Sequence, residues 1–188
     1  MLAEAGAAVL LRRVQKILPG QVELVQTEIA TEGFDLVRPA PGMPALRRVA
    51  EQLMRNRRID LIHPHATGTL EHDPSELAVL LGALGDPDSE SRDSGEPDPG
   101  RGGVPDVYAC KGALGHSLGA SGLVSLVLAY LCAVTGRRPP MPWLQDPLDS
   151  PLALSAKARG TEQRPRTHAV FAAGFGGHVA GAVIRRHS

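Results

Sequence analysis

Short apolar runs, separated by glycine, proline and polar residues, recur along the chain and predict strands. We expect these strands at residues 7–11, 22–29, 59–63, 106–110, 168–173 and 178–186. The run at 7–11 follows no element with which it could pair, so it looks like the cut edge of a larger structure. Residues 22–29 alternate apolar and polar side chains only in part, as a strand at the edge of a mixed sheet does.

From Met43 onward, the apolar period lengthens to that of an amphipathic helix. Apolar side chains fall on one face and arginines on the other, which predicts a helix that covers a sheet. A second helix is expected to begin near Asp73 and Pro74, with Asp73 as its N-cap. The run at 59–63 lies between these helices, and a strand that follows a crossover helix is usually parallel and buried. The pattern predicts an α/β fold with a mixed sheet covered by helices.

Residues 118–134 carry no charge at all. The run is shorter than the roughly 20 residues that a bilayer requires, it is diluted by glycine and serine, and no second span accompanies it. We therefore expect one fully buried central helix and no membrane span. A helix that is apolar on all sides lies between two layers of protein, so the chain should need a second half or a partner.

Composition and charge narrow the class of protein. A chain of 188 residues that is 43% apolar and carries no net charge is expected to form one globular domain over residues 1–188. The lack of net positive charge argues against a nucleic-acid partner. Two cysteines and the absence of a secretory leader favour a reducing, cytoplasmic location. Residues 85–105, rich in glycine, proline, serine and acids, predict a flexible surface insertion within the domain.

Four residues with distinctive chemistry fall at the predicted ends of strands, namely His65, Lys111, His116 and Phe175. Ligands of open α/β sheets bind beyond the carboxyl ends of the strands, so these side chains are candidates for one shared site. Two imidazoles there would each donate an N–H to one carbonyl oxygen and stabilise an enolate or oxyanion. A lysine nearby would keep the site electropositive. Each residue taken singly also has a structural explanation, and only their combination favours a site.

Three other interpretations stay open from the residues alone. His63-x-His65 with His72 and Asp73 resembles the spacing of some metal hydrolases, and such ligands suit zinc, iron or manganese. Against it, Pro64 stiffens the pair and no second ligand cluster follows, so we expect no metal. The glycines at 112–122 lack the order of a dinucleotide-binding loop. The glycines at 174–177 predict either a tight hairpin or a loop that holds Phe175 at a ligand entrance.

Three ordered motifs resemble those of the β-ketoacyl synthases, the condensing enzymes of fatty-acid and polyketide assembly. HATGTLEHDPSELAVL at 65–80 resembles the family's His-Gly-Thr-Gly-Thr…Gly-Asp-Pro…Glu segment. KGALGHSLGASG at 111–122 is similar to its Lys-x-x-x-Gly-His-x-x-Gly-Ala-x-Gly segment, and GFGGH at 174–178 to its closing Gly-Phe-Gly-Gly-Thr-Asn loop. EAGAAVLL at 4–11 resembles the segment that ends the family's first half. The resemblance covers nearly the whole chain, but only the C-terminal half of the family's thiolase-like fold.

The resemblance implies specific roles for residues of this chain. His65 and His116 would bind the carbonyl of a malonyl thioester and promote decarboxylation, and Lys111 would organise the site electrostatically. Substrate contacts are implied for Thr67, Thr69, Phe175, Gly176 and Gly177, with Phe175 as the gating aromatic. The product would be a 3-oxoacyl thioester, with acyl carrier protein as the substrate carrier and no cofactor. The nucleophilic Cys would come from an N-terminal half on another segment or chain, and a dimer is expected.

The chain also departs from the family's motifs. Ser125 stands where an acid often pairs with the lysine, Ala66 replaces a glycine, and His178 replaces a threonine. No cysteine occupies the nucleophile position, and we expect Cys110 to be buried structure. These departures leave an alternative open, namely a non-catalytic subunit comparable with the chain-length-determining partners of ketosynthases.

Overall fold

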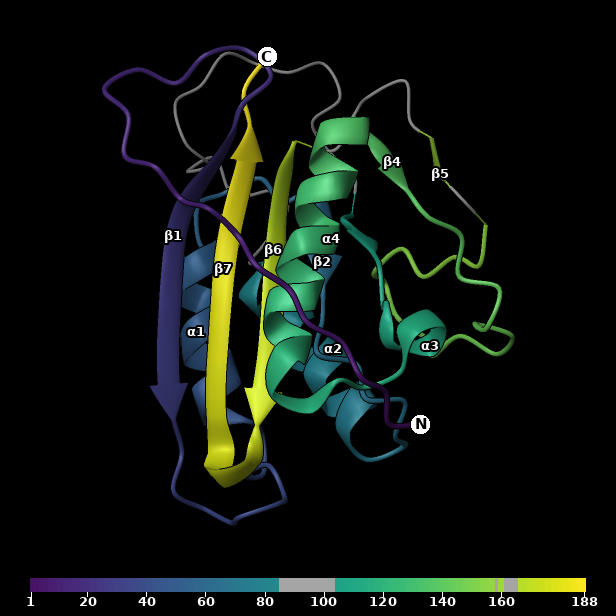
Figure 1. Cartoon of the computed structure of the whole chain (residues 1–188). Coiled ribbons are helices and arrows are strands. Elements are labelled where there is room, and N and C mark those ends of the chain that lie inside the picture. Colours follow the sequence, from purple (N-terminus) through teal and green to yellow (C-terminus); the bar gives the residue numbers. More distant parts are fainter. Residues whose placement is uncertain (85–103, 158, 161–165) are drawn as a thin grey trace.

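One five-stranded mixed sheet organises the chain, in the strand order β1-β7-β6-β2-β3 (Figure 1). The computed structural model describes residues 1–84, 104–157, 159–160 and 166–188. The strands of the sheet are β1 (Val22–Thr31), β2 (Leu61–His63), β3 (Asp106–Val107), β6 (Thr167–Gly174) and β7 (His178–Arg186). A separate pair consists of β4 (Arg137–Arg138) and β5 (Arg159–Gly160). The predicted insertion at 85–105 lies outside the described residues, apart from Val104 and Pro105.

The direction of the strands divides this sheet into two parts. β1, β7 and β6 are antiparallel neighbours, whereas β2 is parallel to both β6 and β3. β1 pairs only with β7 and is therefore an edge strand, as its partial alternation predicted. β2 is fully buried and parallel, as expected of a strand that follows a crossover helix. The carboxyl ends of β2, β3 and β6 consequently lie at the same edge of the sheet.

Helices cover both faces of the sheet. They are α1 (Pro44–Met54), α2 (His72–Ala83), α3 (Lys111–Leu114) and α4 (Ser121–Thr135), with short 3₁₀ turns at Leu118–Ala120 and Phe175–Gly177. In Figure 1, α1 and α2 lie behind the sheet and α4 lies in front of β6 and β7. The fold is therefore the mixed α/β architecture that the sequence predicted.

The main core lies between α1 and the antiparallel strands. Val49 and Leu53 of α1 pack in one buried cluster with Phe171 of β6 and residues of β7. Gly181 of β7 makes this approach feasible, because a Cβ atom there would lie 2.5 Å from Leu53 Cδ1. The apolar face predicted from Met43 onward is thus the face that meets the sheet.

Helix α4 buries only one of its faces within this chain. Its covered stripe consists of Ser121, Ser125, Ala129, Cys132 and Ala133. Tyr130, Leu131 and Val134 are exposed, so the expected burial on all sides is not reached by this chain alone. Residues Leu118–Thr135 are long and apolar enough for one membrane crossing, a test that core helices of soluble proteins also pass. Because the small residues of α4 pack on the sheet, we interpret this helix as part of the fold.

Three predictions about elements were wrong. Residues 7–11 form no strand, and Val9, Leu10 and Leu11 are exposed, because this run pairs with none of the described strands. The third strand ends at Val107 and not at residue 110, because the chain turns there toward α3.

The predicted capping residue of α2 was the third error. Helix α2 begins at His72, its N-cap position is Glu71, and no side chain caps it. The Asp73 carboxylate instead accepts hydrogen bonds from the backbone of the preceding loop.

Candidate functional site

The candidate site lies where β2 and β3 end. His65 follows β2 by two residues, and Lys111 begins α3 four residues after β3. His116 follows α3 in the same loop, which the backbone of residues 1–3 contacts through hydrogen bonds to His116. The predicted residues are therefore brought together because the parallel strands end at one edge.

Two imidazoles, those of His65 and His116, meet at this edge. Their ring centroids are 5.2 Å apart and the rings meet edge to face at 79°. The Nδ1 atom of His116 accepts a hydrogen bond of 3.0 Å from the backbone N–H of Leu118. A neutral His116 must therefore carry its proton on Nε2, which leaves an N–H donor free for a ligand. His65 is buried, and its Nδ1 makes no hydrogen bond within the described part of the chain.

Both imidazoles are held in the neutral form. Burial, followed by the charges of Lys111 and His72, lowers the pKa of His65 to about 3. Burial and the Lys111 charge also lower the pKa of His116. The Lys111 ammonium donates a hydrogen bond to the backbone carbonyl of His65, and burial lowers its own pKa. The site therefore presents two neutral N–H donors beside one ammonium group.

Glu76 of α2 holds the backbone at His65. Its two oxygens accept hydrogen bonds from the backbone N–H groups of His65, at 2.6 Å, and Ala66, at 2.8 Å. The residue is only 1% exposed, and burial raises the pKa of its carboxyl. This role of Glu76 was not predicted from the sequence. The available signal was a single acid at a helix position that faces the buried strand.

Asp73 holds the next two residues in the same way. Its oxygens accept hydrogen bonds from the backbone N–H groups of Thr67 and Gly68, each 3.0 Å long. Burial acts to raise the pKa of Asp73, but His72, the Gly68 backbone N–H and the Thr67 hydroxyl outweigh burial and lower the pKa. The Thr67 and Thr69 hydroxyls lie 3.1 Å apart at the exposed rim. Their predicted contact with substrate stays a prediction.

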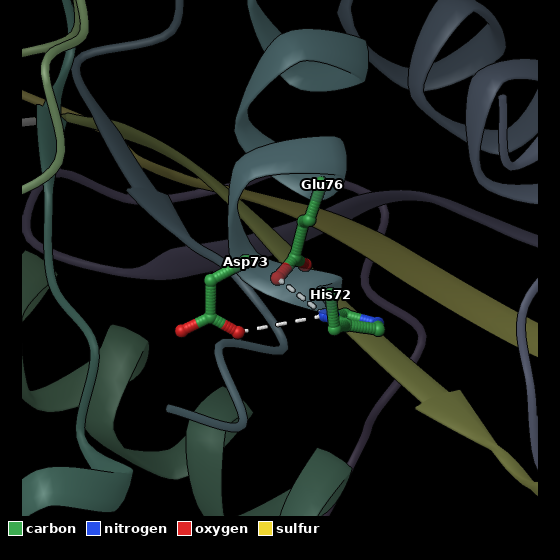
Figure 2. A group of neighbouring side chains, drawn as sticks. All are labelled: His72, Asp73 and Glu76. Atoms are coloured by element: carbon green, nitrogen blue, oxygen red, sulfur yellow. Dashed lines mark ion pairs between the residues drawn. The ribbon is translucent and has the colours of Figure 1, made fainter. Parts of the chain in front are cut away.

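A third imidazole, that of His72, completes the group shown in Figure 2. Its Nδ1 lies 3.6 Å from Asp73 Oδ1 and 3.6 Å from Glu76 Oε2. Among the described residues, this is the one group with the side chains and spacing for a metal ion, since its ligand atoms lie within 4.8 Å of one another. An imidazolium at His72 balances the two carboxylates together with Lys111, so we interpret the group as an ion-paired cluster.

His63 takes no part in this group. Its ring stacks on that of His168 at a centroid distance of 5.6 Å and meets Tyr108 edge to face at 5.8 Å. Burial, followed by the charge of His168, lowers the pKa of His63 well below its ordinary value. The pair His63-x-His65 therefore does not form a shared ligand set, because the two side chains pack against different neighbours.

The turn that carries Phe175 lies at the same edge of the sheet. Phe175 is 67% exposed, and no contact between it and the histidines appears among the described residues. Gly176 and Gly177 both have positive φ angles, and a Cβ atom on Gly177 would lie 2.2 Å from the Glu32 carbonyl oxygen. The hairpin between β6 and β7 is therefore confirmed, and the gating role of Phe175 stays a prediction.

Neither cysteine is placed as a nucleophile. Cys110 is buried, as expected, with its Sγ 3.6 Å from the Ser125 hydroxyl. Cys132 is buried in α4, and burial raises the pKa of its thiol to about 11. With its pKa raised in this way, the Cys132 thiol does not form the reactive thiolate.

Comparison with known proteins identifies a family. Residues 22–144 match the family described as "Beta-ketoacyl synthase, C-terminal domain". The chain is 31% identical over 172 residues to 3-oxoacyl-[acyl-carrier-protein] synthase 2 of Mycobacterium bovis, an alignment covering 87% of this chain and 37% of the relative. It is 32% identical over 190 residues to the enzyme of that name from Mycobacterium leprae, covering 93% of this chain and 40% of the relative.

Solved structures agree on the fold. A ketosynthase complexed with a type II polyketide acyl carrier protein superposes with a TM-score of 0.71 at 17% identity, covering 89% of this chain and 39% of that chain. The ishigamide ketosynthase/chain length factor gives a TM-score of 0.67 at 21% identity, covering 88% of this chain and 38% of that chain. The chain thus spans well under half the length of the proteins that it matches.

Proposed function

The chain belongs to the β-ketoacyl synthase family as its C-terminal domain, and on that basis we propose that it supplies the malonyl-binding half of a 3-oxoacyl-[acyl carrier protein] synthase. The pair of neutral imidazoles, 5.2 Å apart, is the observation that supports this role most directly. The nucleophilic Cys comes from another segment or chain, since both cysteines here are buried. Acyl carrier protein thioesters are the substrates, in fatty-acid or polyketide synthesis, and the assembly is a cytoplasmic dimer.

The reaction proposed is decarboxylative Claisen condensation. The thioester carbonyl oxygen of the malonyl group accepts the Nε2–H of His116 and a ring N–H of His65. Carbon dioxide leaves, and the electrons of the broken C–C bond form an enolate whose negative oxygen the two N–H donors stabilise. Each such donor is worth about 3 kcal/mol in the transition state. The enolate carbon attacks the acyl thioester on the Cys and expels the thiolate, which gives the 3-oxoacyl product.

Neutral imidazoles suit this role because they donate hydrogen bonds without losing a proton to the enolate. The Lys111 ammonium sits beside them and fixes the backbone carbonyl of His65. Its positive charge favours the enolate over the neutral thioester. The Ser125 side chain, which faces Cys110, supplies no acid to pair with Lys111. We therefore assign Lys111 an electrostatic task and no proton transfer.

Substrate access is proposed for the residues at the rim. The Thr67 and Thr69 hydroxyls are exposed enough to contact a phosphopantetheine arm or the malonyl carboxylate. Phe175 stands on a turn that Gly176 and Gly177 allow, and this exposed ring would gate the entrance.

The test measures carbon dioxide release from malonyl carrier protein. The chain is expressed with a Cys-bearing N-terminal half, and His65→Ala and His116→Ala are compared with the wild type. Each variant is expected to lower the rate by about 100-fold or more, because each removes one donor to the developing oxyanion. The lone chain is expected to release carbon dioxide slowly at most, and not to condense. Equal release from both variants and the wild type would contradict the proposal.

A second candidate function is that of a non-catalytic subunit that shapes a ketosynthase heterodimer. The burial of both cysteines and the presence of Ser125 in place of an acid favour it. In that case, a catalytic partner keeps its condensation rate when His65 and His116 are both replaced by alanine. The first proposal instead requires the rate to collapse in the double variant, so one measurement separates the two.

A further inference from the structure

We propose that His72 is a positioning residue for the catalytic loop, defined as residues 65–68, and that it acts by bridging the two carboxylates that hold this loop. The inference deepens the proposed function and rests on it for its activity measurement. It concerns a side chain that touches no reacting atom.

The backbone conformation of the catalytic loop needs contacts from residues outside the loop. Ala66 and Gly68 have φ angles of 42° and 78°, and a positive φ is unfavourable for a residue with a Cβ such as Ala66. All four backbone N–H groups of the loop are bonded to the carboxylates of Asp73 and Glu76. The loop conformation therefore depends on where these two carboxylates lie.

In this chain, a cationic side chain lies between the two carboxylates. Glu76 is almost fully buried, and two adjacent negative groups repel unless a positive charge compensates them. The His72 Nδ1 atom is 3.6 Å from an oxygen of each (Figure 2). The other cation nearby, Lys111, is committed to the His65 carbonyl. The pKa of His72 is raised by Asp73 and Glu76 despite its burial, which agrees with an imidazolium at this place.

His72 also contacts the catalytic ring directly. Its ring lies edge to face against that of His65, with centroids 5.5 Å apart. The His65 ring thus has one imidazole neighbour in His116 and another in His72. A cation at His72 adds to burial and to the Lys111 charge in lowering the pKa of His65, and the His72 ring restricts the orientation of the His65 ring. His72 therefore affects both the backbone and the side chain of His65.

Substitutions at His72 separate its charge from its bulk. His72→Gly removes the imidazole and restores the residue of the synthase segment that 65–76 resembles, whereas His72→Lys keeps a cation. His187→Ala is the matched control, because His187 also pairs with a carboxylate, at 2.9 Å from Glu23, at the end of the sheet remote from the loop (Figure 1). The protein is the full chain together with its Cys-bearing half.

Two measurements test the proposal. In carbon dioxide release from malonyl carrier protein, His72→Gly is expected to lower kcat by about 10-fold to 100-fold with little change in KM, because the donor is misplaced. His72→Lys is expected to recover most of that loss, and His187→Ala to leave the rate unchanged. By NMR of the histidine rings, the pKa of His65 is expected to rise in His72→Gly.

Several results would overturn the proposal. One is a His72→Gly protein whose kcat and His65 titration match the wild type. Another is a His72→Lys protein as impaired as His72→Gly, since the charge would then be irrelevant. A third is stoichiometric zinc or manganese in the wild type that disappears in His72→Gly, because His72 would then be a neutral metal ligand. If the wild-type complex releases no carbon dioxide, the proposed function fails, while the His65 titration still decides the role of His72.

Discussion

Gly177 shows how a single residue fixes the turn beside the candidate site. Its φ angle is 72°, and its carbonyl oxygen accepts a hydrogen bond of 3.0 Å from the Glu32 backbone N–H. The space for a side chain is filled by the backbone of Glu32. The turn that carries Phe175 therefore depends on the absence of a Cβ atom at one position.

Gly177→Ala is expected to lower the free energy of unfolding by about 2–4 kcal/mol, from the positive φ and the clash with Glu32. Gly20→Ala is the control, since Gly20 has a φ of 84° but no atom within 4 Å of its missing Cβ. It should cost only about 1–2 kcal/mol, from the backbone strain alone. Thermal and urea unfolding measure both values, and an equal loss in the two variants would show that the close approach to Glu32 is unimportant.

The buried His65 should make stability depend on pH. Its pKa of about 3 in the folded chain lies below the ordinary 6.5, so the unfolded chain binds a proton that the folded chain rejects. Stability is complete above the unfolded pKa and is lost as the pH falls from about 6.5 toward 3. Between about pH 7 and 5, His65→Gln should lose about 1–2 kcal/mol less than the wild type, measured by urea unfolding. Protonation of His63 still lowers the free energy of unfolding in both proteins as the pH falls. Parallel losses would contradict the prediction.

At the scale of elements, α1 and β7 approach each other at a glycine. A Cβ atom at Gly181 would lie 2.5 Å from Leu53 Cδ1 and 2.9 Å from Val49 Cγ1, both on α1. The amphipathic pattern of α1 was visible in the sequence, because its apolar residues recur at helical spacing. The sequence did not show which strand α1 approaches most closely, because a glycine within a strand does not indicate which helix packs against it.

Gly181→Val is expected to destabilise the chain by about 1–3 kcal/mol, because the helix must move away from the sheet. Gly82→Ala in α2 is the opposite case, since no atom lies within 4 Å of the missing Cβ of Gly82. It should be neutral or stabilise the chain by up to about 1 kcal/mol. Circular dichroism during thermal unfolding gives both changes, and an unaffected Gly181→Val protein would mean that α1 is not packed so closely.

At the scale of the whole molecule, apolar side chains remain exposed in several places, and two of these places lie on runs that the sequence predicted to be strand or buried helix. One is the outer face of α4, with Tyr130, Leu131 and Val134, and the other is the segment at 7–11. The chain covers only 37–40% of the 3-oxoacyl synthases that it matches. In the proposed synthase, the Cys-bearing half would cover both places. An exposed apolar surface of this kind commonly marks an interaction site.

Leu131→Arg on α4 tests this interpretation of the outer face. Leu131 is 48% exposed, so the substitution should change the free energy of unfolding of the chain by less than about 1 kcal/mol. It should abolish co-purification with a Cys-bearing half, because a charge would be buried in the interface. Glu51→Arg on the exposed side of α1 serves as the control. Retained association in Leu131→Arg would show that this face of α4 is not covered by the partner.

The sequence by itself determined the mixed α/β class, the helix from Met43, the glycine hairpin and the pairing of His65 with His116. Periodicity and short motifs are local, and the parallel strands bring their carboxyl ends to one edge wherever such a sheet forms. Only the tertiary structure decided which groups hold those histidines. Glu76, Asp73 and His72 act on residues 65–68 because α2 packs against the end of β2. His63 lies only two residues before His65, but its ring packs against other neighbours. The strand predicted at 7–11 does not form, and the outer face of α4 is exposed in this chain. An apolar run indicates that a segment is buried, but it does not indicate which part of a protein covers it.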